Sequence, residues 1–268
     1  MTLLNLIILA VVQGITEFLP ISSSAHLVLL HEVGGPTGDD LALDVAVHLG
    51  TIAAVILYFH TDAMRALRGL GRLITGRLDG ADSFLALALI IATIPAVIVG
   101  AILALTGWEE VLRNIKVIGW MMILFGVVLW WVHRTAPEAR TAHSWTLRHA
   151  LIMGLWQAVA LIPGVSRSGI SITAARGLGY TRHGAAQLSM LMSIPITLAT
   201  GALLARDMAG STLSPAFLTN AAIAAVLAFG AAYLTLALMM SLLNRVSFTP
   251  YVIYRIALGV VLLAIAYG

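Results

Sequence analysis

Long apolar runs separated by short polar breaks dominate the chain. A membrane-spanning helix needs about 20 predominantly apolar residues, and six runs come close to or exceed this length. They cover approximately residues 41–60, 83–105, 115–133, 184–205, 215–243 and 250–267. Polar and charged residues gather in the breaks between these runs. The pattern predicts an all-α integral membrane protein with six full transmembrane helices.

Two further regions contain apolar segments that are too short to span a bilayer. The first covers about residues 3–31 and is interrupted at Pro20, and the second covers about residues 147–178 and is interrupted at Pro163-Gly164-Val165. Non-helical backbone at membrane depth is tolerated where it lines a buried or hydrated cavity. We therefore expect two re-entrant helical hairpins, which enter the membrane and turn back, within a single membrane domain of residues 1–268.

The two hairpins share a sequence pattern. At an offset of 144 residues, three polar positions of the first hairpin align with three of the second: Gln13 with Gln157, Ser22 with Ser166 and Ser24 with Ser168. A second echo, at a different offset, relates Thr93-Ile94-Pro95 to Ser193-Ile194-Pro195. Chance similarity is a real alternative in a chain rich in Ala, Leu, Ile and Gly. We interpret the pattern as an internal duplication, which predicts an inverted repeat with two hairpin tips that meet near the bilayer midplane.

Composition and charge agree with a membrane location. Only 10% of the residues are charged, whereas soluble domains contain about 25%. The chain has no cysteine, which excludes disulfides, thiol catalysis and thiolate metal sites. The formal net charge is +3 and the basic residues are scattered, so we expect the lipid bilayer, and no nucleic acid, as a partner.

The distribution of basic residues predicts the orientation, because cytoplasmic loops are enriched in Lys and Arg. If neither hairpin crosses the membrane, the breaks at 61–82, 134–148, 176–183 and 244–249 fall on one side and contain ten Arg residues. The opposite side contains three basic residues, Arg113, Lys116 and Arg206. The Arg-rich loops are therefore expected in the cytoplasm. The first hairpin then enters from outside and the second from the cytoplasm.

Candidate chemistry begins in the first hairpin with Gln13 and Glu17. These residues are four apart and share one face of a helix. Glu17 lies in an apolar run, where an ionisable side chain indicates function by default. The alternative is a structural carboxyl that is hydrogen-bonded to Thr16 or to a neighbouring helix.

A serine cluster follows in the same hairpin. Pro20 cannot continue the helix before it, and Ser22, Ser23 or Ser24 can cap the helix that follows. A helix N-terminus with free N–H groups and serine hydroxyls is an anion-binding site. A serine run after proline is more often a plain helix cap, but His26 follows closely and the second hairpin has a similar tip.

That second tip reads Pro163-Gly164-Val165-Ser166-Arg167-Ser168-Gly169. It again combines a helix start with hydroxyls, and it adds an arginine. An arginine at membrane depth is costly, and its planar guanidinium suits phosphate oxygens. The alternative is a structural ion pair between Arg167 and Glu17, which could persist until a substrate arrives.

Two opposed helix N-termini with an arginine, a carboxylate, a histidine and several hydroxyls suit a diphosphate group. Phosphoryl transfer mostly requires charge neutralisation and in-line positioning. Ser23 or Ser24 could attack with His26 as base, His26 could attack directly, or Glu17 could activate water. The sequence leaves these routes open. A carboxylate could also hold Mg²⁺ together with a phosphorylated substrate.

Other residues carry weaker signals. Asp44 and His48 share a helical face and could point at the site, but a cluster at a helix entry is the simpler interpretation. Arg176 is expected to be an interfacial anchor. Arg255 lies inside the last span and needs a buried partner. Glycines such as Gly119 permit close helix packing and are compatible with a homodimer.

Across essentially its full length, the chain resembles the undecaprenyl-diphosphate phosphatase family linked to bacitracin resistance. The resemblance rests on the segment from Gln13 to His26, with its [E/Q]-x-x-x-E start and Pro-x-Ser-Ser core, and on the second tip. The segment from Asp44 to Thr51 is also similar, although many members carry Gln where His48 stands. Gln13 is the less common choice at its position. A second strong metal carboxylate is therefore missing, and metal binding rests on Glu17.

The resemblance implies hydrolysis of a polyprenyl diphosphate, undecaprenyl diphosphate, to the monophosphate, which recycles the lipid carrier for peptidoglycan synthesis. It also implies a divalent cation (Mg²⁺ or Ca²⁺), the bacterial inner membrane and a site that opens to the periplasmic side. By motif match, the catalytic core would be Glu17, Ser23, His26 and Arg167, with Glu17 as metal ligand. Phosphate would be bound by Ser22, Ser24, Ser166, Ser168 and Arg167, with Gln13 in support.

Two rival functions are weighed against this one. A polyprenyl-phosphate transporter or flippase shares the inverted-repeat architecture, but a pure carrier needs no nucleophile and base. A phosphatase of the phosphatidic-acid type would need a histidine six residues after the arginine of a Ser-Arg pair. This chain has Thr173 there.

Overall fold

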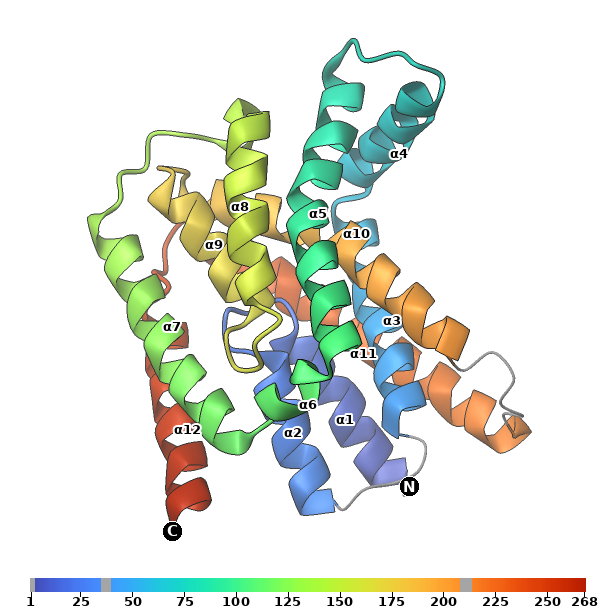
Figure 1. Cartoon of the computed structure of the whole chain (residues 1–268), viewed down its shortest axis with the longest axis vertical. Helices are drawn as coiled ribbons and strands as arrows, with labels where there is room; N and C mark the ends of the chain where they lie inside the picture. The colour runs from blue at the N-terminus through green and yellow to red at the C-terminus, as the bar shows by residue number, and fades with distance from the viewer. Residues whose placement is uncertain (1–2, 35–39, 208–213) are drawn as a thin grey trace.

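The computed structural model describes residues 3–34, 40–207 and 214–268, without the side chains of residues 31–34, 40–42, 109–110, 204–207 and 216 (Figure 1). Within these ranges the regular structure is helical, apart from one isolated bridge between Arg140 and Tyr180. The helices are α1 (Leu3–Thr16), α2 (Ser23–Gly34), α3 (Asp40–Tyr58), α4 (His60–Ile74), α5 (Ala81–Thr106), α6 (Trp108–Leu112), α7 (Ile115–Thr135), α8 (Leu147–Val159), α9 (Arg167–Gly177), α10 (Arg182–Asp207), α11 (Pro215–Leu242) and α12 (Thr249–Tyr267), with a short 3-10 helix at Ala142–Ser144.

Five of the described helices are long and apolar enough to cross a membrane: α5, α7, α10, α11 and α12. Their outward faces carry large exposed apolar side chains such as Ile98, Leu105 and Trp131. A soluble protein does not leave so much apolar surface in water. The protein is therefore an all-α, multi-pass membrane protein.

The expected span at 41–60 differs from the others. α3 has 19 residues, as many as α12, but it bends by 95° into α4 at Phe59. The prediction of a polar loop after residue 60 is wrong, because α4 occupies most of it. Arg65, Arg68 and Arg72 recur at helical spacing on α4, and Arg65 and Arg68 form ion pairs with Asp82 on α5. The many charged residues of this segment made it resemble a loop, although it forms an amphipathic helix.

Local signals set the helix ends as expected from their chemistry. α5 ends at Thr106 and is followed by Gly107, which adopts the left-handed conformation with φ 72°. α7 begins after Asn114, whose side chain accepts a hydrogen bond from the Lys116 N–H at 2.8 Å. A Cβ on Gly119 would lie 2.8 Å from Leu263, so this glycine allows α7 and α12 to pack closely within the chain.

The helical hairpins turn at the positions that Pro20 and Pro163-Gly164 predicted. The first turn (residues 17–22) joins α1 to α2, and the second turn (residues 160–166) joins α8 to α9. Helix α8 ends at Val159, three residues before the expected end at Ile162. Both turns lie near the middle of the view, between α7 and α5 (Figure 1).

Candidate active site at the meeting of the two turns

The two turns lie against each other. Ser168 Oγ, at the start of α9, donates a hydrogen bond of 2.9 Å to the Leu19 carbonyl of the first turn. Arg167, the first residue of α9, forms an ion pair with Glu17. The N-termini of α2 and α9, each with the partial positive charge of a helix start, are thereby brought to one place.

Glu17 is the centre of the polar network. Its side chain is buried, and its Oε2 accepts hydrogen bonds from Gln13 Nε2 at 2.8 Å and from Ser23 Oγ at 2.7 Å. Its Oε1 accepts a hydrogen bond from Arg167 Nη2. His48 Nε2 lies 3.8 Å from Oε2. The carboxylate is held by donors on two sides, as an ionised acceptor should be.

Arg167 connects the site to α10. Its Nη1 donates to Thr197 Oγ1 and, at 3.4 Å, to the Ser193 carbonyl. The ion pair with Glu17 that sequence offered as an alternative is present. The arginine side chain is 21% exposed while that of Glu17 is 7% exposed, so Arg167 is the more accessible member of the pair.

The serines of the first turn have different surroundings. Ser23 Oγ faces Glu17, whereas Ser24 is exposed and its Oγ lies 3.1 Å from Ser22 Oγ. The considered bond between Glu17 and Thr16 is not formed, because the Thr16 hydroxyl donates to the Val12 carbonyl at 2.8 Å.

The serines of the second turn repeat this geometry. Ser166 Oγ lies 3.2 Å from Ser168 Oγ and caps α9 by accepting the Gly169 N–H at 3.1 Å. Ser22 and Ser166 have φ values of 71° and 72°, and they are the non-glycine residues with positive φ in the described part of the chain. Such backbone costs about 1–3 kcal/mol and persists where the surrounding structure imposes it. Ser22 and Ser166, which are 144 residues apart, thus have the same strained backbone conformation.

His26 makes its described hydrogen bonds with the Ser22 backbone and with Tyr254. A carbonyl can only accept, so the His26 Nδ1–H donates to the Ser22 carbonyl at 2.8 Å. In the neutral ring, Nε2 then accepts from the Tyr254 hydroxyl at 2.7 Å. The two rings are stacked with an interplanar angle of 3°. Among the described contacts, Ser23 is paired with Glu17 and not with His26.

Arg255 has its partners in both turns. Its Nη2 donates to the carbonyls of Gly164 and Val165 at 3.1 and 2.8 Å, and its Nη1 donates to the Pro20 carbonyl at 3.4 Å. The side chain is fully buried. The partner that sequence left unidentified is thus the backbone of the two turns.

Two other sequence candidates lie elsewhere or act indirectly. Arg176, expected to be an interfacial anchor, is buried and donates to the carbonyls of Pro137 and Ala136 at 3.1 and 2.9 Å. The backbone carbonyl of Asp44 accepts the His48 Nδ1–H at 2.6 Å, which leaves His48 Nε2 directed toward Glu17.

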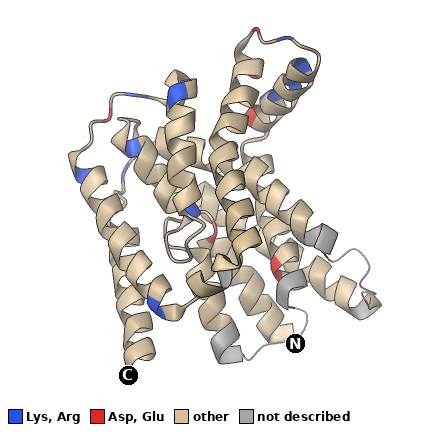
Figure 2. Ribbon diagram, in the orientation of Figure 1, with Lys and Arg blue, Asp and Glu red and all other residues tan. Residues whose placement is uncertain are grey.

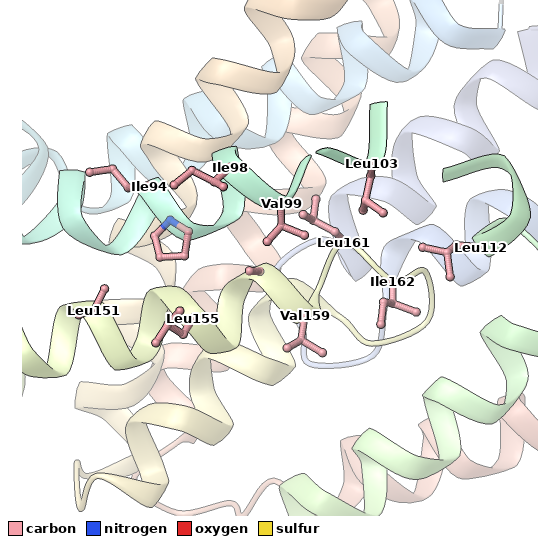
Figure 3. A pocket seen from close by; sticks show the side chains of 12 residues that line it. Ile94, Ile98, Val99, Leu103, Leu112, Leu151, Leu155, Val159, Leu161 and Ile162 are labelled. Carbon is pink, nitrogen blue, oxygen red and sulfur yellow. The ribbon is translucent and has the colours of Figure 1, made fainter. Parts of the chain in front are cut away.

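An apolar groove adjoins the second turn (Figure 3). It lies between α5 and α8, has a volume of about 670 Å³, and ends at Leu161 and Ile162 of the turn. Its lining is entirely hydrocarbon and proline: Ile94, Pro95, Ile98, Val99, Leu103, Leu112, Leu151, Leu155, Ala158, Val159, Leu161 and Ile162. The polar tip and the groove therefore share one turn.

Comparison with known proteins decides the family. The family model described as "Bacitracin resistance protein BacA" matches residues 6–261. The chain belongs to the BacA family. Proteins named undecaprenyl-diphosphatase from Dinoroseobacter shibae and Ruegeria pomeroyi are 59% and 57% identical over the whole of both chains. The undecaprenyl-diphosphatase of Chromohalobacter salexigens is 45% identical over 97% of each chain.

The donor set of this BacA family member fits a cation only in part. The described residues contain no group of three His, Asp or Glu side chains that could hold a metal ion. Gln13 Oε1 is buried without a hydrogen-bond partner in the described structure, next to the Glu17 carboxylate. One carboxylate and one amide oxygen suit Mg²⁺ when substrate phosphates complete its shell. They do not form an all-protein cage.

Sequence reasoning missed three contributors to the site in this BacA family member. Thr197 and Tyr254 lie 30 and 228 residues from their partners, on helices whose apolar pattern gives no sign of an inward polar group. Ser193 belongs to the repeated Ser-Ile-Pro pattern, which was noted in the sequence. That pattern did not indicate that the Ser193 carbonyl accepts a hydrogen bond from Arg167.

Proposed function

We propose that this protein hydrolyses undecaprenyl diphosphate to undecaprenyl phosphate and inorganic phosphate, and so recycles the lipid carrier for peptidoglycan synthesis. One observation carries the proposal beyond the family relationship. A carboxylate, a serine hydroxyl and an arginine (Glu17, Ser23 and Arg167) are joined where two helix N-termini meet inside an apolar protein. These groups are the ones that binding and hydrolysis of a diphosphate require.

Binding begins with an exchange of partners at Arg167. A diphosphate offers the guanidinium a bidentate, doubly charged acceptor in place of the Glu17 carboxylate. The N–H groups at the starts of α2 and α9 and the hydroxyls of Ser22, Ser24, Ser166 and Ser168 complete the anion site. When Arg167 turns to phosphate, Glu17 loses its strongest donor and becomes a better base.

The hydrogen bond from Ser23 to Glu17 favours a serine nucleophile. Ser23 Oγ attacks the terminal phosphorus, its proton passes to Glu17, and the bond from phosphorus to the bridging oxygen breaks. Glu17 gives the proton to the departing lipid phosphate. Water then attacks the phosphoserine, gives a proton to Glu17, and Glu17 returns it to Ser23 as phosphate leaves. Direct attack by water with Glu17 as base uses the same residues without a covalent intermediate.

A divalent cation, Mg²⁺ or Ca²⁺, would be held by Glu17 and Gln13 together with phosphate oxygens. When bound, it would neutralise charge on the diphosphate. Ser23, Arg167 and the helix N-termini keep the roles given above, since they contact the carboxylate or the anion site directly.

The apolar groove supports a substrate with a long hydrocarbon chain. Its end at Ile162 is five residues from Arg167, which limits their separation to about 18 Å of extended chain. A diphosphate at Arg167 and the first isoprene units in the groove are compatible with this span.

For the membrane arrangement we propose six spans and two re-entrant hairpins in an inverted repeat. Helix α3, which bends into the Arg-bearing helix α4, supplies the sixth span, and the nearly equal φ values of Ser22 and Ser166 support the repeat. Basic residues concentrate at the end of the molecule opposite both termini, while few lie near the termini (Figure 2). This supports cytoplasmic Arg-rich loops and a periplasmic opening in the inner membrane. The side chain of Arg206 lies outside the described residues.

The same repeat favours a second candidate, a transporter for polyprenyl phosphates. Phosphate release by purified protein in detergent separates the two. The control is Glu138→Ala, which removes a carboxylate that pairs with Arg176 and Arg182 and does not contact the two turns in the described structure. We expect wild-type protein and this control to release phosphate from undecaprenyl diphosphate, and Glu17→Ala and Arg167→Ala to lose at least about 1,000-fold in rate. Binding of the lipid without release by wild-type protein would favour transport.

A further inference from the structure

Arg255 is a buried charge that the proposed chemistry does not use. It comes from α12, far from both turns in sequence, and its side chain is fully buried. In the described structure its guanidinium contacts three backbone carbonyls, its Nε has no hydrogen-bond partner, and no carboxylate pairs with it. Burying an arginine without an acid is expensive. A side chain that only filled space at this position would carry no charge.

The three carbonyls belong to two different turns. Nη1 reaches Pro20 of the first turn, and Nη2 reaches Gly164 and Val165 of the second. A guanidinium can bridge them because its donors form a rigid planar fork, whereas the ammonium of lysine is a single point. Arg255 thus fixes the position of one turn relative to the other.

The contacts also orient the anion site. The C=O and N–H groups of one planar peptide unit point in opposite directions. With the Val165 carbonyl bound to Arg255, the Ser166 N–H is directed away from the arginine, at the start of α9. The positive charge itself remains against the turns, where Arg167 and Arg255 together exceed the single carboxylate of Glu17.

We infer that Arg255 is a positioning residue for the diphosphate site: it holds the two turns in register and makes the empty site electropositive. The inference rests on the proposed function for its substrate, but its two parts are separable. Holding the turns affects the rate of the chemical step, because a displacement of about 1 Å can cost about 100-fold. The charge affects affinity for the anion.

The test compares Arg255→Lys and Arg255→Gln with the same substitutions at Arg176, a buried arginine that also binds carbonyls but lies outside the site. Three quantities are measured in detergent: thermal stability, binding of inorganic pyrophosphate, and kcat and KM for undecaprenyl diphosphate. We expect Arg255→Lys to bind pyrophosphate nearly as wild type and to lose about 100-fold in kcat. Arg255→Gln should also lose pyrophosphate affinity on the order of tenfold.

The Arg176 variants should lower stability and leave kcat and pyrophosphate affinity of the folded protein unchanged. If the Arg255 variants behave in the same way, Arg255 is merely structural and the inference fails. If Arg255→Gln does not fold, a wild-type kcat in Arg255→Lys overturns the bridging role. If wild-type protein binds pyrophosphate but hydrolyses no lipid, the proposed function fails, while the binding comparison still decides the role of the charge.

Discussion

Ser23 and Ser24 show how much two neighbouring, chemically identical residues can differ. The sequence made both candidates for the nucleophile. The structure gives Ser23 a carboxylate partner at 2.7 Å, whereas Ser24 is exposed and meets only another hydroxyl among its described contacts. Only a hydroxyl with a base beside it is activated for attack.

We therefore expect Ser23→Ala to lower kcat by at least about 1,000-fold, and Ser24→Ala, which removes one hydroxyl of the anion site, to lower it by no more than about tenfold. The assay is release of phosphate, followed by trapping with labelled substrate and location of the label. Label on Ser23 supports the covalent route. If the wild-type protein carries no label although Ser23→Ala is inactive, direct attack by water is supported. Label on His26 contradicts both the Ser23 route and the water route.

Tyr254 is the described partner of His26 Nε2, and it permits a test of the histidine. Tyr254→Phe keeps the stacked ring and removes one hydrogen bond. A net hydrogen bond of about 0.5–1.5 kcal/mol corresponds to a decrease in kcat of about two- to thirteenfold if the His26 orientation matters. Tyr251→Phe, one helical turn earlier, is the control. Equal effects of both variants would show that the Tyr254 hydroxyl has no specific role.

At the scale of elements, the strained serines define the starts of α2 and α9. A positive φ is unfavourable for any residue with a Cβ and is tolerated by glycine. Replacement by alanine keeps the strain, whereas replacement by glycine removes it. The sign of the difference between the two substitutions therefore reports the backbone conformation.

We expect Ser166→Gly to be more stable than Ser166→Ala by about 1–2 kcal/mol. The order should reverse at Ser24, inside α2, where glycine costs about 0.5–1 kcal/mol relative to alanine. Denaturant unfolding in detergent measures both pairs. The same order at both positions would contradict the left-handed backbone at Ser166.

The elements that sequence predicted best are those with one dominant physical signal. Apolar length gave α5, α7, α10, α11 and α12, and proline and glycine gave both turns. Helix α4 was missed because three arginines within one short segment were taken for a solvated loop. The contact between the turns was expected from the internal repeat, and the ion pair between Glu17 and Arg167, which the sequence offered as an alternative, is also present.

At the scale of the whole molecule, the basic residues divide the protein into two ends (Figure 2). The chain has no cysteine, so a single introduced thiol reports its own location. Ala139, in the Arg-rich loop, and Val111, between α5 and α7, are both exposed.

In intact cells, we expect a membrane-impermeant thiol reagent to modify Val111→Cys and to spare Ala139→Cys, because positive loops stay in the cytoplasm. Lysis should make both thiols reactive. The reverse pattern in intact cells would invert the proposed orientation and would open the site to the cytoplasm.

The first residues of α2 and α9 are Ser23 and Arg167, and each follows a strained serine at the same offset. In the proposed repeat, equivalent positions thus hold a hydroxyl in one half and a cation in the other. In this arrangement the two halves have different roles in the reaction, and neither can replace the other. Two copies of the first hairpin would place two acids opposite each other, and two copies of the second would supply a cation without an acid. A symmetric ancestor of the proposed repeat would therefore have lacked the pair of Glu17 and Arg167.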